Sequence, residues 1–114
     1  MRRGEVRWYT FRAPDKRRPV LILTRDSALA FLSSVTVAPI TTTIRDIPSE
    51  VYLTRDDGLF TECAANMDNL QTVSKSRLGP LITTLSTARM LDVNRAISFA
   101  LGLDARAFWE ADIS

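Results

Sequence analysis

The spacing of apolar and polar side chains along the chain predicts a series of short β-strands. In EVRWYTF, residues 5–11, apolar and polar positions alternate with the period of two that is typical of a strand, and aromatic and β-branched residues are frequent. The apolar run VLIL predicts a second strand over residues 20–24. Further strands are predicted at VTVAPI (35–40), EVYLT (50–54) and LITTL (81–85), with one long or two short strands across TECAANMDNLQTV (61–73).

Prolines, glycines and charged residues mark the connections between these strands. The segment FRAPDKRRP, residues 11–19, contains two prolines and five charges, so it is expected to be a loop that ends before the second strand. Pro39 falls inside the third strand, and a proline there favours an edge strand or a bulge. The pair Asp57-Gly58 predicts a turn after the fourth strand, and KSRLG (75–79) predicts a brief helical turn.

Two helices are predicted. A short one, capped by Asp26 or Ser27, is expected to run through Leu32. A longer one is expected to begin at Ser86 and to end at Gly102, where a left-handed cap is favoured. The apolar residues that this helix places on one face are Met90, Val93, Ile97, Ala100 and Leu101.

Several short strands followed by a long amphipathic helix indicate an α+β fold. The expected architecture is a small twisted antiparallel sheet, closed into a partial barrel and plugged by the helix. A length of 114 residues suits one domain over residues 1–114, and the tail DARAFWEADIS (104–114) predicts a further helical turn presenting Phe108 and Trp109. A composition of 46% hydrophobic and 25% charged residues is close to the globular average and argues against disorder.

Composition also limits the chemistry that the chain can carry. It has no histidine, which excludes Ser-His-Asp and Cys-His catalysis and most zinc sites. The single Cys63 cannot form an internal disulfide, no signal-like stretch follows the N-terminus, and no apolar run approaches the roughly 20 residues needed to cross a bilayer. A cytoplasmic protein without a membrane span is therefore expected.

Positive charge is concentrated in the N-terminal part of the chain. Residues 1–30 carry eight Arg or Lys against three Asp or Glu, a net charge of +5, whereas the remainder carries seven against ten, a net charge of −3. This asymmetry suggests a polyanionic partner, and a plain solvated surface explains it about as well.

Three stretches contain candidate functional residues, and each also has a plain structural interpretation. Arg17 and Arg18 precede Pro19 at the start of the second strand, where they are either solvated loop cations or anion ligands. The threonines of VAPITTTIR end the third strand, either through β-propensity or because a hydroxyl faces a substrate. In ANMDNLQTVSK, Asp68 interrupts a strand-like segment, either as a turn residue or as a functional carboxylate.

Together these stretches resemble the MazF/PemK family of toxin endoribonucleases from bacterial type II toxin-antitoxin modules. The motifs that carry the resemblance are RGEV (3–6), RPVLIL (18–23), VAPITT (37–42), D-x-L-x-T-V-x-K (68–75) and a terminal helix ending in ALGL. Their order and spacing match over nearly the whole chain. The resemblance implies a homodimer of SH3-like barrels of the MazF/Kid/CcdB type, each held inactive by a cognate antitoxin.

The resemblance also implies the reaction. Members of the family cut single-stranded RNA without a metal or cofactor, using the ribose 2′-hydroxyl as nucleophile and leaving a 2′,3′-cyclic phosphate and a 5′-hydroxyl. The family's key catalytic positions fall on Arg18 and Thr41. Asp68 is the nearest candidate base by family position, and it either accepts the proton of the 2′-hydroxyl or only orients its neighbours. Asn66 stands where some relatives place a second arginine, which puts a two-arginine mechanism in doubt.

Further residues are predicted to contact RNA. Arginine and lysine suit the phosphate backbone, whereas amides and hydroxyls read unstacked bases. The predicted contacts are Arg12, Lys16, Arg17, Thr42, Arg45, Asn69 and Gln71. Because Trp8 and Tyr9 alternate along the first strand, one is expected to face the core, leaving only the other to stack a base. The loop between the first two strands is shorter than in many relatives, which predicts a more open site that admits folded RNA such as a tRNA arm.

Two other functions stay open at this stage. One is a toxin of the same fold that binds a protein target, as the CcdB group binds DNA gyrase, and the other is an RNA-binding module without catalysis. The motif around Arg18 and the APITT segment favour the nuclease, whereas Asn66 is compatible with the non-catalytic module. The sequence does not specify whether mRNA, tRNA or rRNA is the target.

Overall fold

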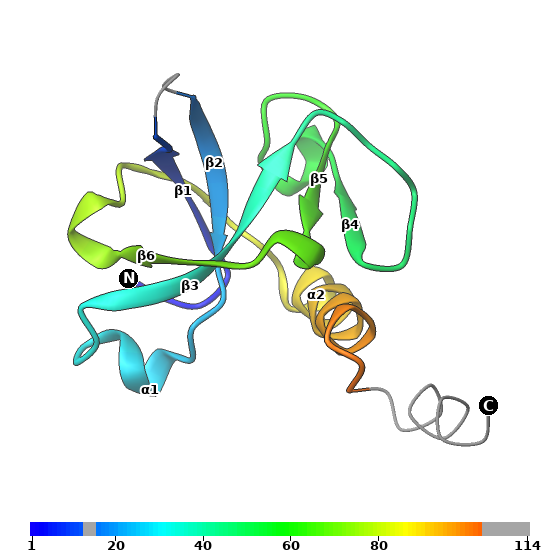
Figure 1. The fold of residues 1–114 in the computed structure, drawn as a ribbon. Coiled ribbons are helices and arrows are strands. Elements are labelled where there is room, and N and C mark those ends of the chain that lie inside the picture. The colour runs from blue at the N-terminus through cyan, green and yellow to red at the C-terminus, as the bar shows by residue number, and fades with distance from the viewer. Residues whose placement is uncertain (13–15, 104–114) are drawn as a thin grey trace.

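The computed structural model describes residues 1–12 and 16–103, which form a strongly curled antiparallel sheet with a helix packed at one end (Figure 1). The predicted helical turn at 104–114 lies outside the described residues. The strands are β1 (Glu5–Thr10), β2 (Arg17–Ile22), β3 (Ser34–Thr41), β4 (Glu50–Leu53), β5 (Cys63–Asn66), β6 (Gln71–Ser74) and β7 (Leu81–Thr84). The helices are α1 (Asp26–Leu29) and α2 (Thr87–Ala100), with single 3₁₀ turns η1 (Arg55–Asp57), η2 (Met67–Asn69) and η3 (Lys75–Arg77). The predicted α+β class is confirmed.

The sheet has the order β4-β5-β3-β2-β1-β7, and β6 pairs separately with β3. β3 is the long diagonal strand of Figure 1, with β6 against its first half and β5 against its end. The prediction that Pro39 marks an edge strand or bulge is wrong, because β3 is central and Pro39 is in register with Val20 of β2. Pro39 falls between the residues that pair with β6, which end at Val37, and those that pair with β5, which begin at Ile40. A residue without an N–H is tolerated at that change of partner.

β2 begins earlier than predicted. Residues 17–19, which were expected to belong to the loop, lie in the strand because the β1–β2 hairpin pairs Thr10 with Arg17, Tyr9 with Arg18 and Trp8 with Pro19. The hairpin ladder therefore carries both arginines as part of the sheet. A side chain on a paired strand is held more firmly than one on a loop, so the hairpin fixes where Arg18 projects.

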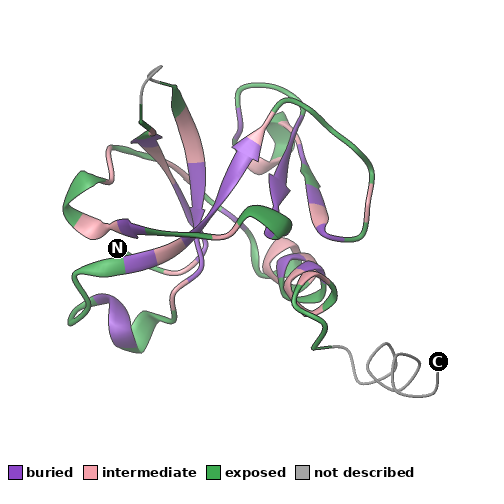
Figure 2. Cartoon of the chain, in the orientation of Figure 1, coloured by how far each residue is buried: buried purple, intermediate pink, exposed green. Residues whose placement is uncertain are grey.

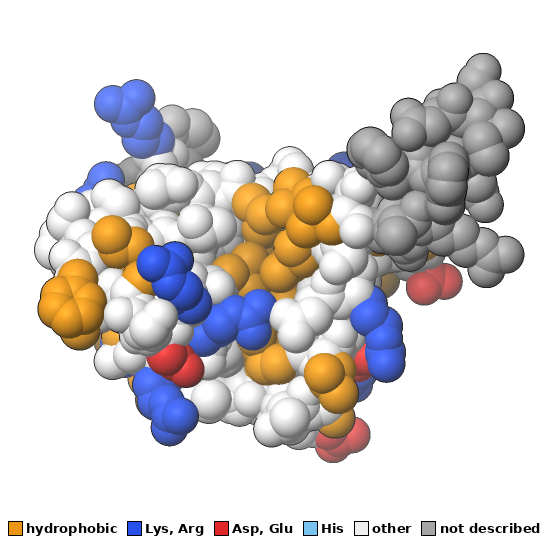
Figure 3. Space-filling model, turned by 90° about the horizontal axis from the view of Figure 1, so that it is seen from below, with side chains coloured by type: hydrophobic (Ala, Val, Ile, Leu, Met, Phe, Trp, Pro, Cys, Tyr) orange, Lys and Arg blue, Asp and Glu red, His pale blue; other side chains and the backbone are white. Residues whose placement is uncertain are grey.

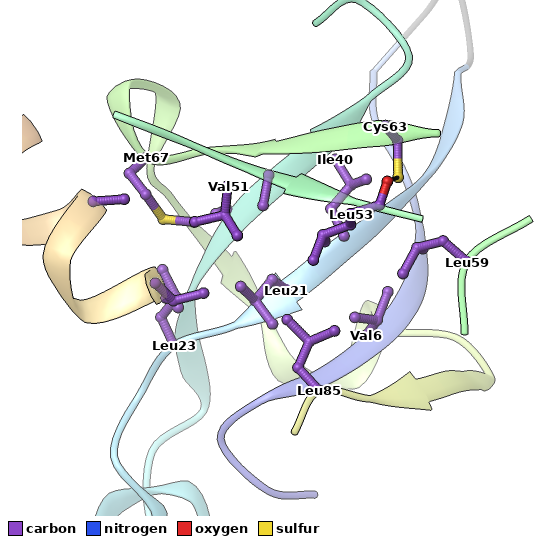
Figure 4. Close-up of a cluster of buried hydrophobic side chains, with 14 residues drawn as sticks. Val6, Leu21, Leu23, Ile40, Val51, Leu53, Leu59, Cys63, Met67 and Leu85 are labelled. Carbon is purple, nitrogen blue, oxygen red and sulfur yellow. Dashed lines mark hydrogen bonds between the residues drawn. The ribbon is translucent and has the colours of Figure 1, made fainter. Parts of the chain in front are cut away.

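Alternate residues of β2 pack into different parts of the core. Leu21 belongs to a cluster against α2 that Figure 4 shows, together with Val6, Leu53 and Val93. Val20 and Ile22 belong to a second cluster on the other face of the strand, with Tyr9, Leu29, Val35, Val37 and Val73. Burial is concentrated where β1, β2 and β3 cross (Figure 2). The uninterrupted apolar run therefore reflects a strand buried on both faces.

The terminal helix matches its predicted boundaries. The hydroxyl of Ser86 accepts from the backbone N–H of Arg89, which is an N-cap, and Gly102 has φ +69° at the other end. Val93 is fully buried, but Leu101 is 56% exposed because it lies beyond the last helical turn. The short helix α1 ends at Leu29 rather than at Leu32. Among the described residues no helix is long and apolar enough to cross a membrane.

Candidate functional site

The candidate site lies where β2 begins and β3 ends. The β2–β3 ladder pairs Ile22 with Val37 and ends at the pair of Val20 with Pro39, and Arg18 and Thr41 each lie two residues beyond that last pair. Beyond the Val20–Pro39 pair the two strands diverge (Figure 1). The space there is a cavity of about 490 Å³ to which both Arg18 and Thr41 contribute. This volume falls within the range of about 300–1,000 Å³ that is usual for ligand pockets.

The lining of this first cavity combines three kinds of side chain. Hydroxyls come from the end of β3 and from the segment before β5, cations come from the start of β2, and aromatic rings come from β1 and the same pre-β5 segment. The polar and aromatic lining residues are Thr41, Thr42, Thr43, Thr61, Lys16, Arg17, Arg18, Trp8 and Phe60. Cations beside hydroxyl donors suit an anion such as a phosphodiester, and the flat rings suit bases.

The hydroxyl oxygen of Thr41 accepts one hydrogen bond within the fold. Its Oγ1 accepts from the backbone N–H of Thr43 at 3.1 Å, which is a local turn at the end of β3. Because that bond uses a lone pair, the hydroxyl hydrogen stays available to donate. Thr41 can therefore donate a hydrogen bond into the cavity while the Thr43 N–H fixes the rotamer of its side chain.

Arg18 is half-buried and, among the described residues, pairs with no carboxylate. The arginines that form ion pairs among the described residues are Arg7, Arg89 and Arg95. Its neighbour Arg17 is placed differently, because its guanidinium lies 4.3 Å from the centroid of the Trp8 ring. Two adjacent arginines thus have separate surroundings, one open to an anion and one packed on an aromatic face.

A second cavity of about 440 Å³ shares Lys16 and Arg18 with the first. Its lining includes Arg12, Asn69 and Gln71, so four predicted RNA contacts gather with Arg18. Asn69 comes from η2 and Gln71 from β6, which pairs beside β3. The two cavities place cationic side chains on both sides of Arg18, and the second adds the amides of Asn69 and Gln71.

Two predicted site residues are placed elsewhere. The carboxylate of Asp68 accepts a 2.5 Å hydrogen bond from Ser49 Oγ and lines neither cavity. Arg45 follows β3, and its backbone N–H donates to Glu50 Oε1 while its side chain is absent from both linings. Asp68 instead belongs to the corner that leads from β5 into η2.

Asn66 has a structural role at that corner. It is buried, and its Oδ1 accepts from the backbone N–H of Asp68 at 2.9 Å, which caps η2. A capping asparagine satisfies a backbone N–H at the start of a turn. The chain thus uses this position to build the turn that carries Asn69 to the second cavity.

The sequence interpretation missed Phe60 and Cys63. Phe60 stacks on Trp8 with ring centroids 5.6 Å apart and an interplanar angle of 17°. Cys63 lines the first cavity at the start of β5, where burial, with a smaller contribution from Asp57, raises the pKa of its thiol to about 11. An aromatic residue two positions after the Asp57-Gly58 turn was the available signal for Phe60. Among the described residues, no three Cys, Asp or Glu side chains gather as metal ligands would.

The underside of the molecule has a different character. A hollow of about 500 Å³ is lined by leucine and isoleucine side chains, with polar neighbours, from the segment after β2, the segment after α1, the segment before β6, and the end of α2. Figure 3 shows this underside, where hydrophobic side chains gather in a band among scattered Lys and Arg. It lacks the cation cluster and the aromatic pair of the Arg18 cavities, so those cavities are the better candidate for an anionic substrate.

Comparison with known proteins agrees with the motifs and the geometry. The model of the PemK-like, MazF-like toxin of type II toxin-antitoxin system matches residues 2–101. Endoribonuclease MazF3 of Mycobacterium tuberculosis is 42% identical over 90 residues, which cover 79% of this chain and 87% of that protein.

Solved structures show the same fold. The Mycobacterium tuberculosis toxin MazF-mt6 matches with a TM-score of 0.76 and 38% identity, over 86% of this chain and 98% of that one. An endoribonuclease from a mycobacterial species, solved in complex with its cognate antitoxin, matches with a TM-score of 0.79 and 32% identity, over 90% and 96% of the two chains. The family resemblance carried by the motifs is confirmed, and this protein belongs to the PemK-like, MazF-like toxins of type II toxin-antitoxin systems.

Proposed function

We propose that this protein is a toxin endoribonuclease that cleaves single-stranded RNA sequence-specifically and without metal, and so inhibits translation and growth until its antitoxin binds. One observation carries the proposal most directly. Arg18 and Thr41 line the same cavity, together with aromatic and further hydroxyl side chains. The identity of the curated relatives as endoribonucleases supports the reaction class.

Arg18 is proposed to bind the scissile phosphate. When the ribose 2′-hydroxyl attacks phosphorus, the phosphoryl oxygens gain negative charge, and a planar guanidinium can donate to two of them. Arg18 suits this task because no described carboxylate competes for it. The 5′-oxygen of the following nucleotide leaves, so the products carry a 2′,3′-cyclic phosphate and a 5′-hydroxyl.

Thr41 is proposed to donate a further hydrogen bond to the same phosphate. Its oxygen already accepts from the Thr43 N–H, so its hydrogen points away from that bond and is free for the substrate. Loss of one such donor commonly lowers the rate by about 10²-fold or more.

Asp68 is proposed to position neighbouring groups rather than to accept the proton of the 2′-hydroxyl. Its hydrogen bond with Ser49 and the bond from its backbone N–H to Asn66 fix η2, and η2 carries Asn69 into the second cavity. The contacts therefore favour orientation of a base-reading amide. A positioning role predicts that Asp68→Asn alters sequence preference more than the rate at a saturating RNA concentration.

The RNA strand is proposed to cross β2 through the two cavities that share Lys16 and Arg18. Arg12 lies on one side and Thr42 on the other, with Asn69 and Gln71 placed to read bases. Arg17 contributes through its contact with Trp8, and Arg45, outside both cavities, is left as a peripheral backbone contact. The short hairpin connection suggests that folded RNA such as a tRNA arm is also admitted, with mRNA and rRNA as the other targets.

A homodimer of single-domain protomers spanning 1–114, inhibited by an acidic antitoxin segment, completes the proposal. A related mycobacterial endoribonuclease is solved with its cognate antitoxin, which supports a protein partner for this chain. The cations around Arg18 would attract an acidic, partly disordered segment that competes with RNA for the same charges.

The decisive experiment incubates the purified protein with a long RNA in excess chelator and maps the cut ends. Defined cuts with 5′-hydroxyl ends are expected from the wild type, and Arg18→Ala and Thr41→Val should each lose activity by about 10²-fold or more. Matched controls are Arg95→Ala, an exposed arginine on α2, and Thr84→Val, an exposed threonine on β7, which should cleave normally.

Other results would contradict the proposal. Absence of cleavage combined with binding to DNA gyrase would support a toxin directed at a protein. Retention of RNA without cutting would support a plain RNA-binding module. Full activity of a folded Arg18→Ala protein would place the catalytic centre elsewhere.

A further inference from the structure

Phe60 is a large apolar side chain left in water beside the Arg18 and Thr41 cavity. It is 60% exposed, and it does not belong to either cluster of the hydrophobic core. Its aromatic partner is Trp8, which also lines the cavity. A single exposed apolar residue is normal on a protein surface, but an exposed aromatic residue stacked on a second one that lines a cavity is a candidate binding surface.

The aromatic pair is held in place from several directions. Trp8 is fixed by β1 pairing with β2, and the Arg17 guanidinium rests 4.3 Å from its ring centroid. The segment carrying Phe60 is anchored by the Arg55 side chain, whose Nε donates to the Phe60 backbone carbonyl at 3.1 Å. Leu59, the preceding residue, is buried in the core. The Phe60 ring is therefore presented to the cavity by a preorganised segment, which lowers the entropic cost of binding.

We propose that Phe60, supported by Trp8, is a stacking subsite for an unpaired nucleobase adjacent to the phosphate that Arg18 binds. The inference rests on the proposed ribonuclease function and assigns a base-recognition role to residues that the catalytic step does not use. Because the two rings are stacked, Trp8 supports one face of Phe60, and a base stacked on the other face of Phe60 would continue the stack and keep its ribose close to Arg18 and Thr41.

The chemistry of the cavity favours a base over an apolar peptide side chain. Lys16, Arg17 and Arg18 surround the aromatic pair, so a ligand there must supply negative charge beside a flat or apolar group. A nucleotide combines both in one unit, and a single strand splays its bases for such contacts. An apolar peptide side chain would need only hydrophobic bulk, so a leucine at position 60 would serve it nearly as well.

The test pairs changes in the protein with changes in the RNA. The probe is a short oligonucleotide containing a cut site mapped in the cleavage assay, with a 2′-deoxy sugar at the scissile position so that it binds without reacting. Each base in turn is replaced by an abasic residue, and affinity is measured for the wild type and for Phe60→Ala, Phe60→Leu and Phe60→Tyr. Phe31→Ala is the matched control, because Phe31 is 87% exposed and lines neither cavity.

For the wild type, one abasic position next to the cut should weaken binding by roughly 5- to 150-fold, the range for loss of one base–aromatic stack. The same abasic change should have little effect in Phe60→Ala and Phe60→Leu, whereas Phe60→Tyr and Phe31→Ala should behave like the wild type. This non-additivity would identify a direct contact between the ring and that base.

The possible outcomes distinguish failure of the Phe60 stacking subsite from failure of the proposed ribonuclease function. If the wild type cleaves RNA while Phe60→Ala keeps full affinity and full sensitivity to every abasic change, the stacking subsite is wrong and the nuclease stands. If Phe60→Leu matches the wild type, the ring is not stacking a base and an apolar contact replaces the proposal. If the wild type neither binds nor cuts RNA, the proposed function fails and the subsite with it.

Discussion

Replacement of Gly58 by alanine should destabilise the protein through two separate effects. Gly58 ends η1 with φ +95° and ψ 8°, a left-handed conformation that costs a residue with a Cβ about 1–2 kcal/mol. A Cβ placed there would also lie 2.3 Å from Thr83 Oγ1 and 2.6 Å from Thr83 Cβ, so β7 or the turn must shift. Overpacking of this kind typically costs about 1–3 kcal/mol, which gives a total loss of about 2–5 kcal/mol.

Urea unfolding followed by circular dichroism would measure this loss. Gly102→Ala is the matched control, because Gly102 has φ +69° but a Cβ added to it would meet nothing within 4 Å, so only the backbone cost of about 1–2 kcal/mol applies. In a Thr83→Gly background, which removes the contact, adding Gly58→Ala should cost little more than Gly102→Ala costs in the wild type. If Gly58→Ala costs no more than Gly102→Ala, the packing of η1 against β7 does not constrain the turn, and the reasoning is refuted.

Three further predictions concern other groups. Burial alone would raise the pKa of Asp57, but hydrogen bonds from Arg89 and the Thr54 N–H and the Arg89 charge lower it. The ionised Asp57 should therefore stabilise the fold above the unfolded-state pKa of about 3.9, and this stabilisation should be lost as pH falls through the lower pKa of the folded state. The difference in free energy of unfolding between the wild type and Asp57→Asn should shrink below about pH 4. A difference that does not depend on pH would contradict this prediction. With a thiol pKa of about 11, Cys63 should react slowly with iodoacetamide at pH 8 in the folded protein and rapidly in denaturant, and equal rates would show that the thiol is not buried. Asn66→Ala should lose about 0.5–2 kcal/mol of stability in urea unfolding, because it removes the side chain that caps the Asp68 N–H. Asn69→Ala, at an exposed neighbouring position, should change the stability little. Equal losses in the two variants would argue against the cap.

Local patterns in the sequence were sufficient for most of the elements. The run VLIL suits a strand that is buried on both faces. Ser86 supplies the acceptor for a backbone N–H at the start of α2, and Gly102 supplies the left-handed residue after its end. Pro39 was misread because its surroundings depend on which strands lie beside β3, and β5 and β6 are distant in sequence. The rule that proline favours an edge strand or a bulge uses only neighbouring residues, so it does not include a change of pairing partner along the strand.

The candidate site was predictable only in part for the same reason. Arg18 and Thr41 were predicted through a family resemblance, and the β2–β3 pairing brings their strands together. Asp68 was grouped with them by family position, whereas its hydrogen bond to Ser49 ties it to the corner before β4, 19 residues earlier in the chain. Phe60 carries no motif, because its importance comes from its contact with Trp8, 52 residues away.

The burial of β2 explains why Arg17 and Arg18 have different surroundings. Successive residues of a strand face opposite sides, so Arg17 shares a face with Pro19, and Pro19 is in register with Trp8 of β1. Arg17 is thus a diagonal neighbour of Trp8 and packs on its ring, whereas Arg18 shares a face with Val20 and lines one cavity with Thr41. A slip of one residue would exchange these faces and would also move Leu21 and Val20 into each other's clusters, which the packing of both forbids. The apolar residues that follow the two arginines therefore determine which of them packs on Trp8 and which is left for the proposed phosphate contact.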